Sequence, residues 1–566
     1  MKTTAHDVTS HSGQFERELA RRVFVSRALI EPKAILVVVA FASLLILPIA
    51  VWGIPEGGDL ANHYRAAIPF YESLQSGNLY PGWLAESNAG YGDPRFRFYP
   101  PGFYFLLAAF KMFVGWYGAT VLAFALLSIA GSLGVYFWTR NFLPPPQAML
   151  AGMLYAVAPY HLNELYQASL LSEYAGCAVL PFVFGFIDRV CTNRRLVDVA
   201  GLGASYALLI LSNLPLAVIG SLSALLFGIF RADRRVLAQT FLRLGVGVVL
   251  GLVASAFFWV RMVSELSWIK GGGVDPKPYY DYRFNFLFSS DALTNRNTWY
   301  ANLLALTTIA FLLPAIVLIR KDRRYIPIAV VTLFSFFMAL PLSKPIWAII
   351  PKLSEVQFPW RWLAVVSLTG SVLLAASASR WIELFKSRIR PLHLVPLLGL
   401  ILSLGFVTTQ VVWEAHYLTR RQFDDFLPTM RGAVSFKDWL PVSARQIIEL
   451  PKMSANVESQ SRQITTEAWT PEYRRFSLSD GPGEEVRVKT FHYPNWIATA
   501  GGVPLQVRSS PDGVMLVTIP SGPTTVDLRF REPQKVRVAG LVSGLSWIFI
   551  LAIIILNRRS NSSDGV

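Results

Sequence analysis

Long runs of apolar residues recur along this chain, and they restrict the fold more than any other feature. The first run, residues 34–54, carries no charge after Lys33 and has the roughly 20 residues that a helix needs to cross about 30 Å of hydrocarbon. A cleaved signal peptide is the alternative, but the run is too long, lacks a small-residue cleavage site and follows a 33-residue polar leader. We therefore expect a retained membrane span.

Further apolar runs follow, each bounded by charged residues or by Gly, Pro and Asn. They lie at residues 102–115, 119–139, 146–160, 174–190, 197–211, 215–230, 240–262, 300–319, 326–341, 359–379, 391–412 and 537–556. A composition of 53% hydrophobic and 16% charged residues agrees with this pattern. The expected fold class is an α-helical polytopic membrane protein with about 12 or 13 transmembrane helices.

The net charge of +16 is distributed in a way that indicates membrane topology. Lys and Arg do not gather on one soluble segment with interleaved aromatic residues, so nucleic acid is not an expected partner. They cluster in short loops between apolar runs, as the positive-inside rule predicts for cytoplasmic loops. The clusters lie at residues 17–22, 193–195, 231–235, 320–324, 386–390 and 557–559.

Counting crossings from the two ends of the chain leaves a conflict of one crossing between residues 100 and 160. Loop 55–100 lies outside when counted from a cytoplasmic N-terminus, and segment 413–536 lies outside when counted from the C-terminus. The runs 102–115 and 146–160 are both short for a full span. We therefore expect one of them to be re-entrant or half of a broken helix.

Two polar segments stand out from the apolar pattern. Loop 55–100 is one, and the other, 413–536, alternates apolar and polar residues between "PDG" and "PSG" turn signals, which predicts a small β-rich extracytoplasmic domain. The expected organisation is a cytoplasmic tail at 1–33, a transmembrane domain at 34–412, the β-rich domain at 413–536, a final span at 537–556 and a cytoplasmic tail at 557–566.

The motifs of soluble nucleotide chemistry are absent from the sequence. It contains no Walker loop, GxSxG, HExxH, CxxC pair or dinucleotide fingerprint. Its two cysteines, Cys177 and Cys191, flank one expected span, so they would lie near opposite membrane faces and could not form a disulfide. A donor or substrate delivered through the membrane is therefore the more attractive hypothesis.

The residues after Asp59 predict an amphipathic helix that lies in the membrane interface. Its apolar positions recur at helical spacing, at Leu60, Tyr64, Ala67, Phe70, Tyr71 and Leu74. Asp59 follows two glycines and begins this helix, and His63 follows one turn later. Asp59 is either an N-cap, since Asp is a favoured capping residue, or a functional acid.

Three ionisable residues, His161, Glu164 and Glu173, lie between apolar runs at the expected outer membrane level. A charged group costs about 2.5–3.5 kcal/mol at the centre of a membrane helix and less near its end, so such groups indicate function by default. Glu173 is the more interesting acid because a strongly apolar helix begins directly after it. The alternative is that Glu173 stabilises the N-terminus of that helix, where an anion is favourable.

Arg361 stands between Trp360 and Trp362 at the start of an otherwise uncharged run. Its guanidinium offers a fork for phosphate, or it stacks on one of these indoles as an interfacial anchor. Tyr99 lies in the aromatic-rich end of loop 55–100, where aromatic rings are expected in any membrane protein.

Together these segments resemble the GT-C superfamily of polytopic glycosyltransferases, which use polyprenyl-phosphate-linked sugars. The resemblance covers nearly the whole chain and rests on "GGDLANHY", "SGNLYPGWLAESNAGYGDPRFRFYPP", "PYHLNELYQASLLSEYAG", "LSNLPLAVIG", "VQFPWRWL" and "YPNWIATAGG". The sequence looks most like the bacterial subgroup labelled 6-pyruvoyl-tetrahydropterin synthase-related membrane proteins. That label names no activity that these residues could support.

The resemblance implies roles for individual residues. Asp59 matches the acid that acts as base on the acceptor in an inverting transfer, and Arg361 is expected to stabilise the phosphate leaving group. Glu173, or Glu164, matches the second acid, which orients the acceptor or holds a metal where one is used. Related sequences often carry His at the position of Asn213, which keeps hydrogen bonding but not a proton switch. The remaining expected substrate contacts are His63, Tyr99, His161 and Trp360.

The resemblance implies no certain cofactor. Two carboxylates without a tight ligand motif leave metal dependence open, with a divalent metal as one option.

The expected function is therefore transfer of a hexosyl or pentosyl group from a polyprenyl-phosphate donor to an extracytoplasmic glycan, lipid or protein of the cell envelope. The enzyme would lie in the inner membrane, surrounded by membrane lipids, with its active site on the extracytoplasmic face. A transporter or flippase for a lipid-linked glycan is the alternative, but no internal repeat is visible. A third option is an assembly scaffold, which would tolerate loss of Asp59, Glu173 and Arg361 together.

Overall fold

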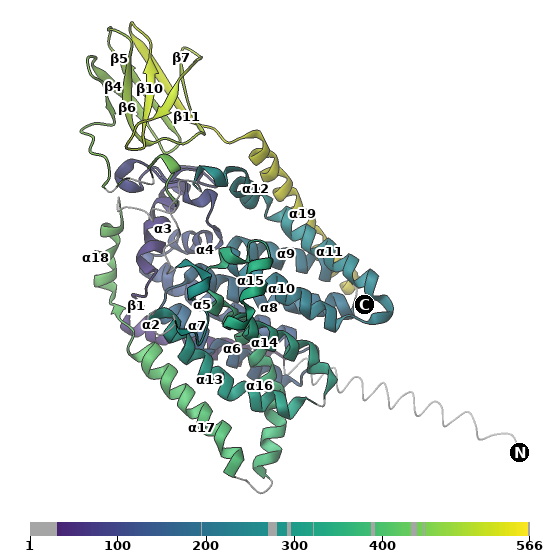
Figure 1. The fold of residues 1–566 in the computed structure, drawn as a ribbon. Helices are drawn as coiled ribbons and strands as arrows, with labels where there is room; N and C mark the ends of the chain where they lie inside the picture. Colours follow the sequence, from purple (N-terminus) through teal and green to yellow (C-terminus); the bar gives the residue numbers. More distant parts are fainter. Residues whose placement is uncertain are drawn as a thin grey trace, which may run out of the picture.

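The computed structural model describes residues 31–563, except for 194, 270–279, 291–295, 321, 387–390, 432–438, 445, 446 and 448. The chain forms a large helical body with a β-rich region at one end (Figure 1). This arrangement confirms the predicted fold class. Most of the predicted N-terminal tail, residues 1–33, lies outside the described residues.

The helical body contains helices of very different lengths. They are α4 (Gly102–Lys111), α5 (Trp116–Thr139), α6 (Pro145–Ala156), α7 (Pro159–Tyr166), α8 (Leu171–Thr192), α9 (Leu196–Ser212), α10 (Leu214–Arg231), α11 (Leu237–Ala254), α12 (Ala256–Glu265), α13 (Arg296–Ile319), α14 (Ile326–Met338), α15 (Lys344–Ile349), α16 (Leu363–Lys386), α17 (Pro391–Phe406) and α19 (Gln534–Ser563). Among the described residues, six helices are long and apolar enough to cross a membrane, or seven if the pair bent by 90° near residue 340 is one span. The predicted 12 or 13 crossings stay a prediction.

The two short runs between residues 100 and 160 both form short helices, α4 and α6. Helix α6 ends at Ala156, and α7 begins at Pro159. The break is expected, because a proline disfavours the helical conformation of the residue before it. The run 146–160 is thus interrupted at residues 157 and 158, and the re-entrant or half-helix character expected for one of the two runs stays a prediction. The two cysteines are free and buried, and both lie on α8.

The first apolar run is also interrupted. A helix over residues 31–44 is followed by α2 (Leu47–Trp52), and α2 ends at Gly53. Gly53 has a φ of +128°, and a Cβ there would lie 2.1 Å from the carbonyl oxygen of Leu418. Only glycine allows this approach, after which β1 (Ile54–Pro55) pairs with β2 (Tyr417–Leu418). This pairing joins the first loop to the start of the C-terminal segment.

The helix predicted after Asp59 is present as α3 (Leu60–Gln75). It is covered on one side by α18 (Arg420–Met430), whose Phe423 packs edge-on against Tyr64 with ring centroids 5.1 Å apart. On another side Phe70 packs against Phe96 of the same loop, at 4.4 Å. Most of α3 is therefore buried within protein.

The β-rich region is a sandwich of two antiparallel sheets, ordered β3-β6-β10-β9 and β4-β5-β11-β7-β8. The strands are β3 (Val457–Glu458), β4 (Ile464–Trp469), β5 (Tyr473–Leu478), β6 (Glu484–Phe491), β7 (Trp496–Ala500), β8 (Val503–Leu505), β9 (Val507–Ser509), β10 (Val514–Ile519) and β11 (Thr524–Phe530). Val488 of β6 and Leu528 of β11 share one apolar core. The strands lie inside the predicted segment 413–536, and the domain boundaries themselves stay predictions.

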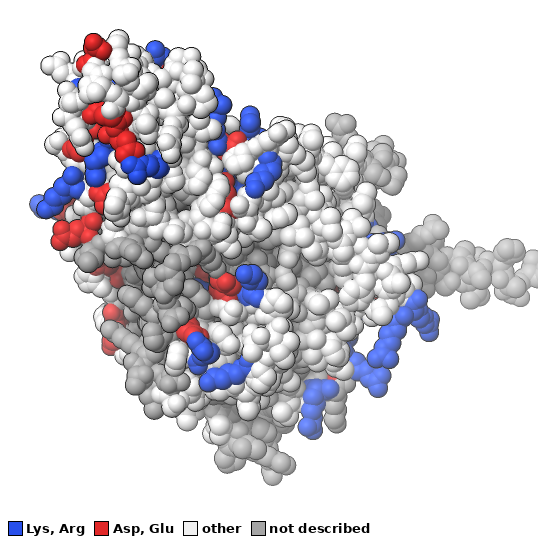
Figure 2. All heavy atoms as spheres, turned by 45° about the horizontal axis from the view of Figure 1, so that its top comes forward, with Lys and Arg blue, Asp and Glu red and all other residues white. Residues whose placement is uncertain are grey.

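Loop 55–100 contributes to this sandwich. The indole of Trp83 is fully buried against Tyr493, Trp496 and Phe530, with ring centroids 5.7–5.9 Å apart. Acidic and basic side chains gather over the β-rich region, whereas most of the helical surface on the same face lacks them (Figure 2).

A buried network of charges fastens the sandwich to the helical body. Arg97 of the first loop donates to Glu265 at the end of α12, with Nη2 2.6 Å from Oε1. It also donates to Glu532, which follows β11, with Nη1 2.6 Å from Oε1. Arg261 donates to the same oxygen of Glu532 at 2.9 Å, and the Tyr493 hydroxyl donates to Glu265 at 2.9 Å. We call Arg97, Arg261, Glu265 and Glu532 the charge clamp.

Candidate functional site

Asp59 occupies the N-cap position of α3, but its side chain makes no capping hydrogen bond. Instead its Oδ1 accepts a hydrogen bond from the Asn62 side chain at 3.2 Å. Burial raises the pKa of Asp59 above its ordinary value, while the bond from Asn62 and the charge of Arg361 act in the opposite direction. The carboxylate is therefore oriented by a side chain one turn later, beside a cation from a distant segment.

The imidazole of His63 does not bond to the Asp59 carboxylate; only the backbone N–H of His63 donates to the Asp59 carbonyl, at 3.0 Å. Its Nδ1 lies 2.8 Å from the hydroxyl of Tyr104 on α4, and its Nε2 accepts from the backbone N–H of Leu171 at 3.3 Å. Burial, with the nearby charge of Arg95, lowers the pKa of His63 to about 3. His63 is thus a neutral link between α3, α4 and the start of α8, and substrate binding by it stays a prediction.

Glu173 and Arg361 form a buried ion pair. Glu173 lies in the first turn of α8, and its Oε2 accepts from Arg361 Nε at 2.9 Å. Its other oxygen, Oε1, accepts from the Tyr160 hydroxyl of α7 at 2.7 Å. The alternative role of Glu173 at its own helix terminus does not account for these two partners, which come from other elements. The pair holds α8 against the turn Pro359–Trp362 that leads into α16.

Arg361 stacks on an aromatic ring, although not on the tryptophans beside it. Its guanidinium carbon lies 4.9 Å from the centre of the Phe358 ring, and its Nη1 donates to the carbonyl of Val356 at 2.7 Å. Trp360 is buried and stacks on Phe358 at 5.0 Å. Since the bonds to Glu173 and Val356 use Nε and Nη1, they leave Nη2 as the donor for an anion.

Tyr99 lies close to the same groups. Burial raises the pKa of its phenol; the nearby Asp59 carboxylate adds to this, and Ser172, Arg361 and Arg95 oppose it. The structure therefore brings together Asp59, Tyr99, Glu173 and Arg361 from four separate elements. The first turns of α3 and α8 and the turn before α16 meet here.

His161 and Glu164 form a second buried group one helix turn apart on α7. His161 Nδ1 lies 2.8 Å from Glu164 Oε2, and Glu164 Oε1 lies 3.5 Å from the thiol of Cys177. Within the described part of the chain, His161, Glu164 and Cys177 are the group of three potential metal-binding side chains whose ligand atoms all lie within 4.8 Å of one another. Imidazole and thiolate donors suit zinc better than Mg²⁺ or Ca²⁺, which prefer oxygen ligands. Metal dependence itself stays open.

Asn213 has a capping role. It lies between α9 and α10, and its side-chain oxygen accepts from the backbone N–H of Leu216 at 2.8 Å. It also approaches α8, because a Cβ at Gly176 would lie 3.3 Å from the Asn213 Cβ. Substrate binding by Asn213, as by Trp360 and His161, stays a prediction.

The sequence reasoning misses Asn62 and Tyr160, which hold the two carboxylates. Asn62 lies three residues after Asp59, so helical spacing would have placed both on one face of α3. Tyr160 gave no comparable signal, because its bond to Glu173 crosses the break between α7 and α8.

The chemistry that this arrangement can support is base catalysis beside an anion site. A carboxylate whose pKa is raised is a stronger base than an ordinary aspartate. The starts of α3, α8 and α16 carry positive partial charge, and a guanidinium is the side chain best suited to bind phosphate. Glu173 balances the charge of Arg361 and fixes its position.

The solved structures that partly resemble this chain include two glycosyltransferases, both at low identity. The arabinofuranosyltransferase AftD from mycobacteria matches over 68% of this chain and 27% of its own, at 17% identity and a TM-score of 0.45. The Archaeoglobus fulgidus oligosaccharyltransferase in the apo form matches over 69% of this chain and 57% of its own, at 14% identity and a TM-score of 0.44. This chain therefore spans about a quarter of the first protein and less than two thirds of the second.

No protein with a curated function matches the sequence. A family match is more informative, because residues 96–418 match the family described as "6-pyruvoyl-tetrahydropterin synthase related domain; membrane protein". The match contains Tyr99, Glu173 and Arg361, and begins after Asp59 and His63. It covers more than half of the chain, which therefore belongs to the 6-pyruvoyl-tetrahydropterin synthase-related family of membrane proteins.

Proposed function

We propose that this protein is an inner-membrane glycosyltransferase that moves a sugar from a polyprenyl-phosphate donor to an extracytoplasmic acceptor. The observation that carries the proposal is the meeting of Asp59 with the Glu173–Arg361 pair at the starts of three helices. A base and an anion site are the two groups that an inverting transfer from a lipid phosphate needs. The sequence resemblance to the GT-C superfamily supports the same reaction class.

In the proposed reaction, Asp59 accepts the proton of an acceptor hydroxyl as that oxygen bonds to the anomeric carbon. The bond from the anomeric carbon to the phosphate oxygen breaks, and its electron pair remains on the lipid phosphate. Arg361 stabilises the charge that develops on this leaving group. Glu173 keeps the guanidinium in place, and the phenol of Tyr99 is a further hydrogen-bond donor in the same group of residues.

The test is transfer by a variant that changes only the base. Asp59→Asn keeps the size and the hydrogen-bonding capacity of the side chain but cannot accept the proton. We expect it to fold and to lose transfer by about 100- to 10,000-fold, the usual contribution of a general base. Asp424→Asn, on the exposed face of α18, is the matched control. Full activity of a folded Asp59→Asn variant would exclude this role for Asp59.

The same assay separates the other two candidate functions. A flippase moves its lipid-linked glycan without forming a new glycosidic bond, so no product of transfer would appear. A scaffold would retain its cellular function when Asp59, Glu173 and Arg361 are replaced together.

A further inference from the structure

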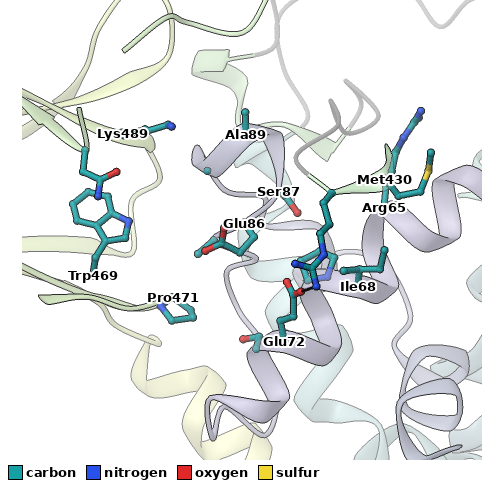
Figure 3. A pocket seen from close by; sticks show the side chains of 16 residues that line it. Arg65, Ile68, Glu72, Glu86, Ser87, Ala89, Met430, Trp469, Pro471 and Lys489 are labelled. Atoms are coloured by element: carbon teal, nitrogen blue, oxygen red, sulfur yellow. Dashed lines mark ion pairs between the residues drawn. The ribbon is translucent and has the colours of Figure 1, made fainter. Parts of the chain in front are cut away.

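A cavity of about 700 Å³ lies between the β-rich region and α3. Its volume falls within the roughly 300–1,000 Å³ of small-molecule sites. In Figure 3, Trp469 and Lys489 of the sandwich lie on one wall, and Arg65, Ile68 and Glu72 of α3 lie on the opposite wall. We call this space the sandwich pocket. None of its lining residues belongs to the candidate site described above.

The first loop closes the sandwich pocket between these walls. Glu86, Ser87 and Ala89 lie between the sandwich and α3 (Figure 3). Arg431, at the C-terminal end of α18, also lines the pocket. Arg431 pairs with Glu72 of α3, with Nη2 2.5 Å from Oε1. Three distant segments of the chain therefore build one lining.

The lining combines one aromatic face with many polar groups. The guanidinium carbon of Arg474 lies 4.2 Å from the centre of the Trp469 indole and 4.8 Å from the centre of the Trp496 indole. The guanidinium therefore covers one face of Trp469. The side chain of Asn456 and the charged groups of Lys489 and Glu86 add hydrogen-bond donors and acceptors. Sugar rings present an apolar C–H face and adjacent hydroxyl pairs, and this lining offers a counterpart to both. A lipid acyl chain would instead leave the charged groups unpaired.

Polar atoms in the lining also lack protein partners. The hydroxyls of Ser73 and Ser87 and the Nε of Arg65 are buried without a hydrogen-bond partner among the described residues. Ser73 and Ser87 are only 3% and 5% exposed. Because buried polar groups are normally paired, such atoms favour a ligand rich in hydroxyls.

Hydrogen bonds along α3 link Arg65, in the lining of the sandwich pocket, to Asp59. Asn62 donates to Asp59 at 3.2 Å, and Arg65 Nη1 donates to the Asn62 side-chain oxygen at 3.3 Å. Glu72 lies two turns after Arg65 on the same side of α3, about 20 Å along the helix axis from Asp59 at 1.5 Å rise per residue. A ligand that extends from Asp59 into the pocket must therefore be elongated.

We propose that the sandwich pocket binds the distal sugars of an oligosaccharide acceptor whose terminal hydroxyl reaches Asp59. This inference rests on the proposed function and names the acceptor class as a glycan chain, not a lipid or a protein. Trp469 stacks on one sugar ring, and Lys489, Glu86 and Asn456 bond to its hydroxyls. Arg65 and Asn62 line the path from the pocket to the reacting end.

Binding is tested on the full-length protein in detergent by calorimetric titration with defined oligosaccharides of increasing length. A peptide and phospholipid vesicles serve as parallel probes. We expect affinity to rise with glycan length, and Trp469→Ala to weaken binding of the longer glycans about tenfold. Trp413→Ala, which removes an indole that is 69% exposed and lies outside the pocket, is the control.

Lys489→Ala is the second variant, because it leaves the stacking of Trp469 on Arg474 in place. It is also expected to weaken glycan binding. Unchanged affinity in both variants, or binding of the peptide or the vesicles alone, overturns the proposal.

Transfer assays keep the two proposals distinguishable. In both pocket variants we expect KM for long acceptors to rise, because binding remote from the reacting atoms is lost. Oligosaccharide binding without transfer from any polyprenyl-phosphate donor would contradict the proposed function and leave the pocket assignment standing. Transfer with unchanged KM in both variants would contradict the pocket assignment alone.

Discussion

At the scale of single residues, the main result concerns what Asp59 contacts. An aspartate at the start of a helix normally bonds to the amides of its own first turn, yet this side chain bonds to Asn62. That bond lowers the pKa of Asp59 against the larger, opposite effect of burial. Asn62 therefore extends to lower pH the range in which Asp59 is ionised.

Replacing Asn62 should move the pH dependence of transfer in a definite direction. Without the hydrogen bond the pKa of Asp59 rises further, so a larger fraction of the acid is protonated at a given low pH. We expect the acidic limb of the kcat/KM profile to shift to higher pH in Asn62→Ala. A profile that keeps its acidic limb unchanged would mean that Asp59 is not the titrating base.

The Glu173–Arg361 pair allows its structural and its chemical contributions to be separated. Arg361→Gln leaves the buried carboxylate of Glu173 uncompensated, which should destabilise the protein by about 3–5 kcal/mol. The double variant with Glu173→Gln removes both charges and should recover most of the melting temperature. We expect transfer to stay low in both. Recovery of transfer along with stability would show that Arg361 acts only in folding.

At the scale of elements, the charge clamp connects three segments that are far apart in sequence. Arg97 is held by Glu265 and Glu532, and burial alone would raise the pKa of Glu532. The bond from Arg97 and the charge of Arg261 outweigh burial and lower it. Glu532 therefore stays ionised at neutral pH, and the clamp fixes the sandwich over the helical body.

Removing one carboxylate of the charge clamp should loosen this attachment. Glu265→Gln leaves Arg97 with one ionised partner in a buried site, at a cost of about 3–5 kcal/mol. The expected result is a lower melting temperature in detergent and faster proteolysis of the β-rich region. Glu467→Gln, which removes an exposed carboxylate of the sandwich, is the control. Equal effects of the two changes would contradict a special role for the clamp.

Elements with a local sequence signal could be predicted, and elements made by distant contacts could not. Helical spacing predicted α3, and "PDG" and "PSG" predicted turns whose Gly513 and Gly522 have φ of +79° and +88°. The first strands of the sandwich, from β3 to β5, were not individually predicted. The clamp gave no signal, because Arg97 and Glu532 are 435 positions apart.

The candidate site divides in the same way. The presence of ionisable residues at the starts of apolar runs indicated Glu173 and Arg361. Their ion pair could not be predicted, because it joins two elements that are distant in sequence. His63 lies one turn from Asp59, yet it faces Tyr104 and Leu171. Sequence spacing places residues on a face of a helix, and only the packing of neighbouring helices decides what that face contacts.

At the scale of the whole molecule, the first loop and the β-rich region form one unit. Trp83 completes the core of the sandwich, and Gly92 lies directly against it with a φ of +88°. A Cβ at Gly92 would lie 2.2 Å from the indole, so only glycine fits. The loop that carries Asp59 at its start is thus held at its middle by the sandwich.

Removing the indole should therefore affect parts of the molecule that are distant in sequence. Trp83→Ala should destabilise the protein by about 3–5 kcal/mol, the usual cost of deleting a large buried aromatic side chain. Limited proteolysis should then cut both the first loop and the β-rich region at similar rates. Cleavage confined to the loop would mean that the sandwich does not depend on Trp83.

The central claim is that a lipid phosphate binds between Arg361 and Asp59. The most direct measurement is a cryo-EM structure of the full-length protein with a bound polyprenyl phosphate. We expect phosphate density in contact with the Arg361 guanidinium, with a free phosphate oxygen directed toward Asp59. A phosphate bound elsewhere, with neither Arg361 nor Asp59 nearby, would contradict the account.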